Sequence, residues 1–287
     1  MKRGGKTNTH IAWKIIALTS ALAILLFASC SCAGGNSKEY SAANLKSTQN
    51  ALTDKTFYWL GSSVTLGMES GEEAVADYIA AGNGAVCKKE AVSGTTLIDE
   101  PYKKFFKSYD SYVTRLKTTT EFDKNAKVDA FFCQISTNDA KSKYAEKRGK
   151  VTAADVVDKD AFDVKTSVGA LEYIVAYAAE TWNCPIYLFS NARFDDEGKR
   201  ASKDPKGSEY ADLVKAAHAV AEKWNAMDGI TVKVIDLFND REFNAVSDED
   251  YEFYMHDAVH PYKAGYLKWW TPAFEKVLLE DFGGREA

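Results

Sequence analysis

The sequence has few of the residues that mark disulfide-rich, fibrous or zinc-binding proteins. Two of its 5 cysteines are Cys30 and Cys32, so only Cys87, Cys133 and Cys184 remain further along the chain. Three cysteines are too few for a disulfide scaffold, and their spacing matches no zinc motif. The 18 glycines and 5 prolines follow no repeat, which excludes collagen-like and low-complexity chains.

Acidic residues are absent before Cys30, whereas Lys2, Arg3, Lys6 and Lys14 all precede it. The whole chain has a formal net charge of -5, so removal of these four cations leaves -9. A surface this acidic repels phosphate backbones, and we therefore expect no nucleic-acid partner. With 46% hydrophobic and 27% charged residues, the sequence has the composition of a folded globular protein.

The N-terminal segment predicts export. Its basic start is followed by an uncharged apolar stretch, 15–27, which is shorter than the ~20 residues of a spanning helix. The residues Phe27-Ala28-Ser29-Cys30 resemble the lipobox of bacterial lipoproteins, in which the cysteine becomes the acylated first residue. An uncleaved N-terminal membrane anchor is the alternative, and both interpretations place the rest of the chain outside the cytoplasmic membrane. We predict a lipoprotein signal peptide over 1–29, a lipid anchor on Cys30, a polar tether over 30–52 and one domain over 53–287.

Short apolar runs alternate with amphipathic ones from residue 56 onward. Brief runs rich in β-branched and aromatic residues predict buried strands at 57–60, 85–92, 128–135, 185–189 and 231–237. Apolar residues at helical spacing predict helices over 72–81, 166–182, 208–227 and after Pro261. This alternation implies one α/β domain, with a mostly parallel sheet covered by helices on both faces. The charged stretch 140–165 interrupts the pattern, and we expect a lid over one end of the sheet or a solvated loop.

Small and polar residues directly follow the predicted strands. In a parallel sheet, sites form at the carboxyl ends of the strands, so such residues meet at one edge. Ser63 follows the first strand, Gly94 the second and Asn138 the third, while Asp257 and His260 precede the last helix. Each is ordinary alone, since serine and asparagine are common in turns and caps and glycine at positive φ. Their order along the chain nevertheless predicts a site at this edge.

A serine nucleophile needs a base, and the chain has 4 histidines. His10 lies in the leader, and His218 lies on an amphipathic helix, where we expect it to pack against the sheet. Asp257 precedes His260 by three positions, and in a turn this spacing lets the carboxylate accept the Nδ1 proton while Nε2 faces a substrate. Asp257 could equally cap the helix that begins near Pro261.

A metal site formed by His256, Asp257 and His260 is a further interpretation, since histidines four apart share one helix face. Pro261 argues against it, because the residue before a proline is pushed out of the helical region. The sequence also has no HExxH pattern. We therefore expect no metal.

Together these residues resemble the SGNH hydrolases, the superfamily of GDSL esterases and lipases. The resemblance spans 57–279, nearly the whole predicted domain. Ser62 replaces the aspartate of the first family block, and Ser136 replaces the glycine of the third. The four blocks match, in order, Gly61-Ser62-Ser63, Gly94, Ser136-Thr137-Asn138-Asp139, and Asp257 with His260.

The resemblance implies a Ser-His-Asp mechanism on a flavodoxin-like, three-layer α/β/α fold. Ser63 would be the nucleophile and His260 the general base, oriented by Asp257. The backbone N–H groups of Ser63 and Gly94 and the side-chain amide of Asn138 would form the oxyanion hole. No metal or organic cofactor is required.

For an exported, tethered member of this superfamily we expect O-acyl substrates, chiefly acetyl esters on cell-wall or extracellular polysaccharide. Aromatic side chains can pack on sugar rings, but Trp269 and Trp270 lie in the last predicted helix, where we expect core packing. A lipase or lysophospholipase would need an apolar acyl groove, and no apolar run indicates one. A glycan-binding surface protein without activity is the alternative from another class. The presence of Ser63, Asn138 and His260 together argues against it.

Overall fold

The computed structural model describes residues 34–284, and its central element is a five-stranded parallel sheet. The strand order is β2-β1-β5-β6-β7, and every pair in this sheet is parallel. The predicted signal peptide and Cys30 lie outside the described residues. The strands are β1 (Thr56–Gly61), β2 (Val86–Ala91), β5 (Ala130–Gln134), β6 (Ile186–Phe189) and β7 (Val232–Ile235).

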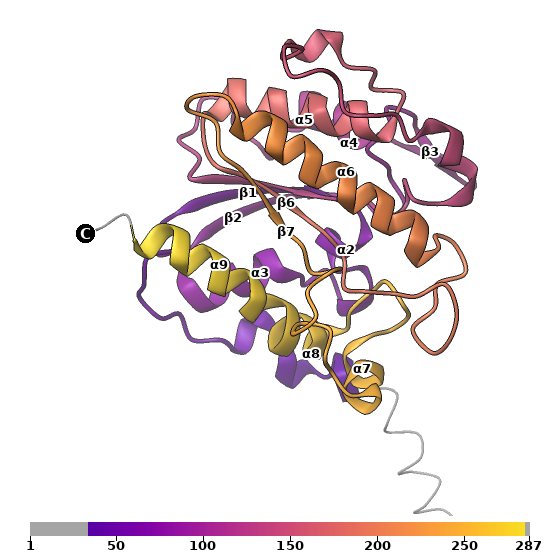
Figure 1. Ribbon diagram of the computed structural model, residues 1–287. Coiled ribbons are helices and arrows are strands. Elements are labelled where there is room, and N and C mark those ends of the chain that lie inside the picture. The colour runs from indigo at the N-terminus through magenta and orange to yellow at the C-terminus, as the bar shows by residue number, and fades with distance from the viewer. Residues whose placement is uncertain (1–33, 285–287) are drawn as a thin grey trace, which may run out of the picture.

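Helices cover both faces of this sheet (Figure 1). On one face lie α4 (Tyr112–Thr118), α5 (Ser167–Trp182) and α6 (Gly207–Asn225). On the other lie α3 (Val75–Asn83) and α9 (Thr271–Gly283). The three-layer α/β/α architecture expected from the sequence is therefore confirmed.

Alternating strand residues divide the core into two apolar clusters, because successive side chains of a strand point to opposite faces. In β1, Tyr58 and Leu60 pack with the cluster under α5 and α6, whereas Phe57 and Trp59 pack with the cluster under α3 and α9. All four side chains are almost fully buried. A sheet covered on both faces needs such continuous apolar strands, which is why brief apolar runs in the sequence predicted them.

The predicted strands and helices are all present, with shifted ends. The last helical segment is divided into α8 (Lys263–Gly265), a π-helix (Tyr266–Trp270) and α9. Trp269 and Trp270 are buried in the core, as expected. The elements that were not predicted from the sequence include α4, α7 (Asp248–Tyr254) and the antiparallel strands β3 (Tyr102–Lys104) and β4 (Lys107–Tyr109).

The described part of the predicted tether, 34–52, packs against the domain. Its short 3-10 helices lie at Gly34–Asn36, Lys38–Tyr40 and Ala42–Asn44. Ser41 donates to the Glu73 carboxylate at 2.7 Å, and Leu52 is fully buried. The packed body therefore begins before residue 53, because this segment contributes apolar side chains to the core beside α3.

The stretch 140–165 lies along the outer side of α5 and α6 (Figure 1). Its short 3-10 helices are Ser142–Lys147 and Lys159–Ala161. The buried ammonium of Lys223 on α6 donates to Thr152 at 2.6 Å and to Glu172 on α5 at 2.6 Å. Thr152 thus fixes the middle of this segment to the buried Lys223–Glu172 ion pair of the helical layer, so the segment is not a free loop. Its first residues do reach the sheet edge, where Lys141 lines a cleft with Ser63.

Candidate active site

The first strand ends in a tight turn that carries Ser63. Helix α2 (Ser63–Leu66) begins two residues after β1. A Cβ on Gly61 would lie 1.8 Å from Thr65 Oγ1, so only glycine lets the strand pass this close to α2. Ser63 is 4% exposed, and its side chain faces the carboxyl edge of the sheet, where His260 lies.

Ser63, His260 and Asp257 form a continuous hydrogen-bonded chain. His260 Nε2 lies 2.8 Å from Ser63 Oγ. The other ring nitrogen, Nδ1, lies 2.9 Å from Asp257 Oδ2 and 3.0 Å from Oδ1. A histidine whose Nδ1–H is held by a carboxylate presents its Nε2 lone pair to the hydroxyl, which is the arrangement needed to accept a proton.

The Asp257 carboxylate is fixed by its own turn. It accepts hydrogen bonds from the backbone N–H groups of Val259 at 2.7 Å and His260 at 2.8 Å. Partial burial favours the neutral acid, but these hydrogen bonds and that of the His260 ring lower the pKa of Asp257 to about 2. Asp257 does not cap the next helix, because α8 begins only at Lys263.

His218 and His256, the other histidines among the described residues, do not contact this hydrogen-bonded chain. His256 Nδ1 lies 3.1 Å from the Tyr262 hydroxyl, and no group of three His, Cys, Asp or Glu side chains within 34–284 is placed to hold a metal ion. The expectation that His218 packs against the sheet is wrong. Its side chain is half-exposed, and Nε2 lies 2.8 Å from the carboxylate of Asp236, the residue that follows β7.

Asn138 and Gly94 lie at the same edge of the sheet. Asn138 is 6% exposed, and its Nδ2 donates to the Thr95 carbonyl at 3.1 Å. Gly94 has φ +84, and a Cβ there would lie 2.5 Å from the ring of Tyr102. Both the left-handed backbone and the ring therefore require glycine. Among the described residues no group accepts a hydrogen bond from the Ser63 N–H, which is thus available to a ligand.

Two adjoining clefts lie at this edge of the sheet, and Ser63 lines one of them. The first, of about 350 Å³, includes Asn138, Lys141 and Asp204 in its walls with the Ser63–His260 pair. The second, of about 770 Å³, includes Arg200, Tyr251, Phe253 and Tyr262. Asp257 borders both clefts, so a ligand held at Ser63 can extend from one into the other.

Gln134, the last residue of β5, was not predicted as a site residue. Its fully buried Oε1 accepts from the N–H of Ser62 at 3.0 Å and from the N–H and hydroxyl of Thr65 at 3.2 and 2.8 Å. The amide oxygen therefore satisfies free donors at the start of α2 and fixes Ser63 between them. A polar residue at the end of the apolar run Phe131–Gln134 is the sequence signal that could have indicated it.

Two further residues hold the loops of this edge, and neither was predicted. The Arg115 guanidinium on α4 donates to the Gly61 carbonyl at 2.8 Å and to Thr95 Oγ1 at 3.1 Å. Asn191, which follows β6, donates to the Val259 carbonyl at 2.9 Å. Asn191 also occupies a strand end, so the rule that selected Ser63 and Asn138 could have found it.

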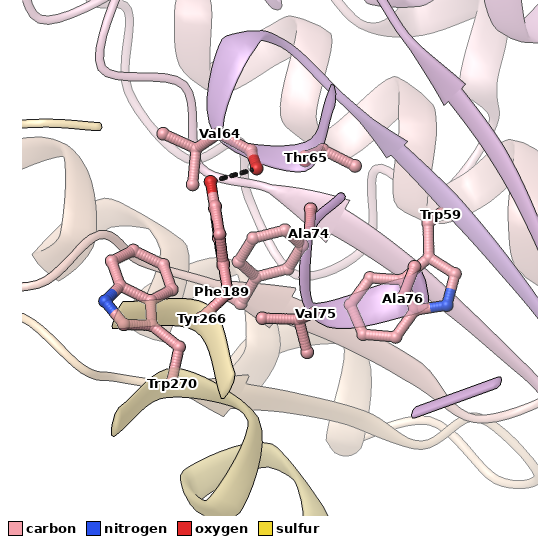
Figure 2. Close-up of a pocket in the computed structure, with 9 residues that line it drawn as sticks. All are labelled: Trp59, Val64, Thr65, Ala74, Val75, Ala76, Phe189, Tyr266 and Trp270. Carbon is pink, nitrogen blue, oxygen red and sulfur yellow. Dashed lines mark hydrogen bonds between the residues drawn. The ribbon is translucent and has the colours of Figure 1, made fainter. Parts of the chain in front are cut away.

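The core supports α2 from beneath. Figure 2 shows Val64 and Thr65 of α2 over an apolar layer that includes Val75, Phe189 and Trp270. Within this layer the Tyr266 hydroxyl donates to the Val64 carbonyl at 2.7 Å. The π-helix thus contributes one polar contact that fixes the turn bearing Ser63.

Asp139 has a buried carboxylate next to Asn138. Burial raises the pKa of Asp139 to about 6, although hydrogen bonds from the N–H groups of Ile98 at 3.1 Å and Leu97 at 2.8 Å lower it. The carboxylate ties the loop after β5 to the loop after β2. It is therefore placed to set the spacing between Asn138 and Gly94.

Comparison with solved structures identifies the fold. The chain resembles a Lactobacillus plantarum protein with a TM-score of 0.55 and 19% identity, over 79% of this chain and 97% of that one. It also resembles a carbohydrate acetylesterase family member from Sinorhizobium meliloti with a TM-score of 0.51 and 15% identity, over 80% and 99% of the two chains. The native M. smegmatis aryl esterase matches with a TM-score of 0.50 and 12% identity, over 78% and 98%.

The chain has the fold of the SGNH hydrolases. At these identities the similarity concerns the fold, and the chemistry must be argued from the side chains of this chain. No protein-family model matches the sequence, and neither does any curated protein.

Proposed function

We propose that the protein is a serine ester hydrolase. The observation that carries this proposal is the hydrogen-bonded chain from Ser63 Oγ through the His260 ring to Asp257, with contacts of 2.8 and 2.9 Å. A protein that only binds its ligand does not need a serine hydroxyl placed to transfer its proton to a histidine. The folds shared with an acetylesterase family member and an aryl esterase agree with this reading.

In the proposed reaction, Ser63 Oγ attacks the ester carbonyl while His260 Nε2 takes the hydroxyl proton. The carbonyl oxygen becomes negatively charged and accepts hydrogen bonds from the N–H groups of Ser63 and Gly94 and from the Asn138 amide. Nδ2 of Asn138 lies 3.1 Å from the Thr95 carbonyl and 3.5 Å from Ser62 Oγ, and these two contacts fix the amide beside Ser63. Each fixed donor of this kind lowers the barrier by about 2.7 to 4 kcal/mol.

The tetrahedral intermediate then collapses to an acyl-enzyme. The C–O bond to the alcohol breaks, and His260 returns the proton to the departing oxygen. Water next attacks the acyl carbon and gives its proton to His260, after which the carboxylic acid leaves and Ser63 is regenerated. Asp257 stays ionised throughout and stabilises the charged imidazole. No step needs a metal or an organic cofactor.

We propose O-acetyl groups on cell-surface or extracellular polysaccharide as the substrate. Polar side chains such as Lys141, Ser202 and Asp204 form much of the cleft at Ser63, which suits a short acyl group better than a long apolar chain. The adjoining cleft is large enough for sugar units and contains the aromatic residues Phe253 and Tyr262. These features support a carbohydrate ester over a lipid substrate.

We further propose that the protein is exported and acts outside the cytoplasmic membrane, attached by a lipid on Cys30. The apolar leader and the lipobox-like residues before Cys30 support this proposal. Growth with a labelled fatty acid tests it: the full chain should carry the label, and the Cys30→Ala variant should lose it. Equal labelling of both chains would exclude Cys30 as the acylated residue.

The activity is tested by hydrolysis of aryl acetate and of a panel that includes acetylated xylan and peptidoglycan. Ser63→Ala should abolish hydrolysis. Ser62→Ala is the matched control, because Ser62 is the adjacent buried serine and its hydroxyl contacts Gln134 and Asn138 at 3.5 Å but not His260. It should retain far more activity than Ser63→Ala. Equal rates for Ser63→Ala and the parent would refute the assignment, and faster cleavage of octanoyl than acetyl esters would favour a lipase.

A further inference from the structure

The most exposed apolar side chains of the described chain occupy the tip of the β3–β4 hairpin. Phe105 is 92% exposed and Phe106 is fully exposed, at 106%, whereas the next large apolar side chain, Val86, is 47% exposed. Exposure of two adjacent phenylalanines is costly in water, so this tip is suited to an apolar surrounding. Phe105 also has φ +55, a conformation in which glycine or asparagine would be usual.

Three lysines surround this tip. Lys103, Lys104 and Lys107 are exposed, and none of them forms an ion pair within residues 34–284. Among the described acidic residues of 99–110, Glu100 is paired with Lys147 and Asp99 lies 4.0 Å from Lys165, so only Asp110 has no ion-pair partner. On a chain with net charge -5, this is a local cationic site.

The base of the hairpin is braced against the body. Tyr102 and Tyr109 are directly paired across the two strands, and their rings stack with centroids 6.1 Å apart. The Tyr102 ring also packs against Gly94. The hairpin is therefore held at the edge of the sheet that contains Ser63, with its tip pointing away from the packed body.

We propose that the β3–β4 hairpin is a membrane-contact element that inserts Phe105 and Phe106 into the surface of a bilayer containing anionic lipid. The arrangement of tyrosines at the base, lysines beside the tip and phenylalanines at the tip matches the layers of such a surface. Phenyl rings enter the acyl boundary, ammonium groups meet anionic headgroups, and tyrosines lie at the interface.

Other occupants fit this hairpin less well. A glycan is bound by hydrogen bonds beside flat aromatic faces, but the tip has only phenyl rings and lysines. A second copy of this acidic chain would have to bury the lysines against an apolar pocket, and a lipid surface needs no such pocket. Charge complementarity therefore favours anionic lipid, and it does so whether or not Ser63 is a nucleophile.

Trypsin protection of the full chain in vesicles tests the proposal. The chain is incorporated into phosphatidylcholine vesicles with or without phosphatidylglycerol, and cleavage after Lys103, Lys104 and Lys107 is measured by mass spectrometry. Cleavage after Lys127, an exposed loop lysine, is the internal reference and cancels any effect of the leader. We expect the hairpin-to-reference ratio to fall roughly tenfold or more with phosphatidylglycerol only.

Two variants make the result specific. The double variant Phe105→Ser, Phe106→Ser keeps every trypsin site and should lose this protection, whereas Leu279→Ser, which removes an exposed apolar side chain of α9, should keep it. An unchanged ratio, equal protection by phosphatidylcholine alone, or full protection of the double variant would overturn the proposal. Protection that grows with protein concentration in the absence of vesicles would also overturn it and indicate self-association.

Discussion

Gln134 and Thr65 lie 69 positions apart, yet one amide oxygen of Gln134 accepts both the N–H and the hydroxyl of Thr65. The same oxygen accepts the Ser62 N–H at 3.0 Å. The end of β5 therefore determines how α2 begins, and with it the direction in which Ser63 points.

Gln134→Met, which conserves volume, should reduce both stability and activity. The substitution leaves buried donors of Ser62 and Thr65 without an acceptor, and each such group costs about 1 to 3 kcal/mol. We expect a loss of about 2 to 4 kcal/mol in urea unfolding and a lower kcat/KM for aryl acetate. Thr65→Val removes only one donor and should cost less in both measurements. If the methionine variant unfolds like the parent, Gln134 does not hold α2.

Asp257→Asn should lower kcat by roughly 10³ to 10⁴-fold with little effect on folding. The asparagine oxygen can still accept from the backbone of Val259 and His260, but its amide cannot hold the Nδ1–H tautomer. Steady-state kinetics and a melting curve of the same preparation separate the two effects. Asp204→Asn, in the same cleft, is the control and should change kcat less than about tenfold. Equal losses for both variants would argue that Asp257 has no orienting role.

Gly94→Ala should destabilise the protein through both its backbone and the Tyr102 ring. The positive φ costs a non-glycine residue about 1 kcal/mol, and the contact at 2.5 Å adds to it. Gly229→Ala is the matched control, because Gly229 has φ +82 and no atom within 4 Å of the added Cβ.

Thermal unfolding of the two alanine variants should therefore differ, with Gly94→Ala the less stable. Adding Tyr102→Ala to Gly94→Ala should recover part of that difference, since the clash with the ring is removed and only the strain of the positive φ remains. Indistinguishable melting temperatures for Gly94→Ala and Gly229→Ala would show that the Tyr102 ring can move away from the added methyl group without loss of stability.

The buried carboxyl of Asp139 should make the protein less stable as pH rises from about 4 to about 6. Its folded pKa, about 6, lies above the value of the unfolded chain, so the folded state binds the proton more tightly across this window. The loss amounts to at most about 3 kcal/mol. Asp257 acts in the opposite sense and below this range, between about pH 4 and 2, because its pKa is lowered.

Urea unfolding of the parent and of Asp139→Asn at several pH values from 4.5 to 7 checks this expectation. The variant lacks the titrating group, so its stability relative to the parent should rise with pH over this interval. Groups common to both chains cancel in the difference. Parallel stability curves would show that Asp139 titrates at the same pH in the folded and unfolded chains.

Local patterns in the sequence determined the fold class and part of the site. The strands and helices could be predicted because each must bury one or both of its faces. This burial places apolar residues in a characteristic pattern within a single short segment. Asp257 and His260 lie three positions apart, so their pairing needs only a turn. Ser63 and Asn138 were identified because each follows a strand whose carboxyl end can be read from the sequence.

The tertiary structure alone decided which distant groups meet. Ser63 and His260 are 197 positions apart, and their 2.8 Å contact depends on the strand order and on a loop that Asn191 holds. Gln134 and Arg115 reach the site from β5 and α4. The apolar residues of these two elements indicate that they are buried, but not which groups their polar side chains contact. The same holds for residues 34–52 and for the β3–β4 hairpin, whose placement follows from packing between segments. Periodicity describes how one segment meets the core, but a contact between segments is a property of their joint arrangement.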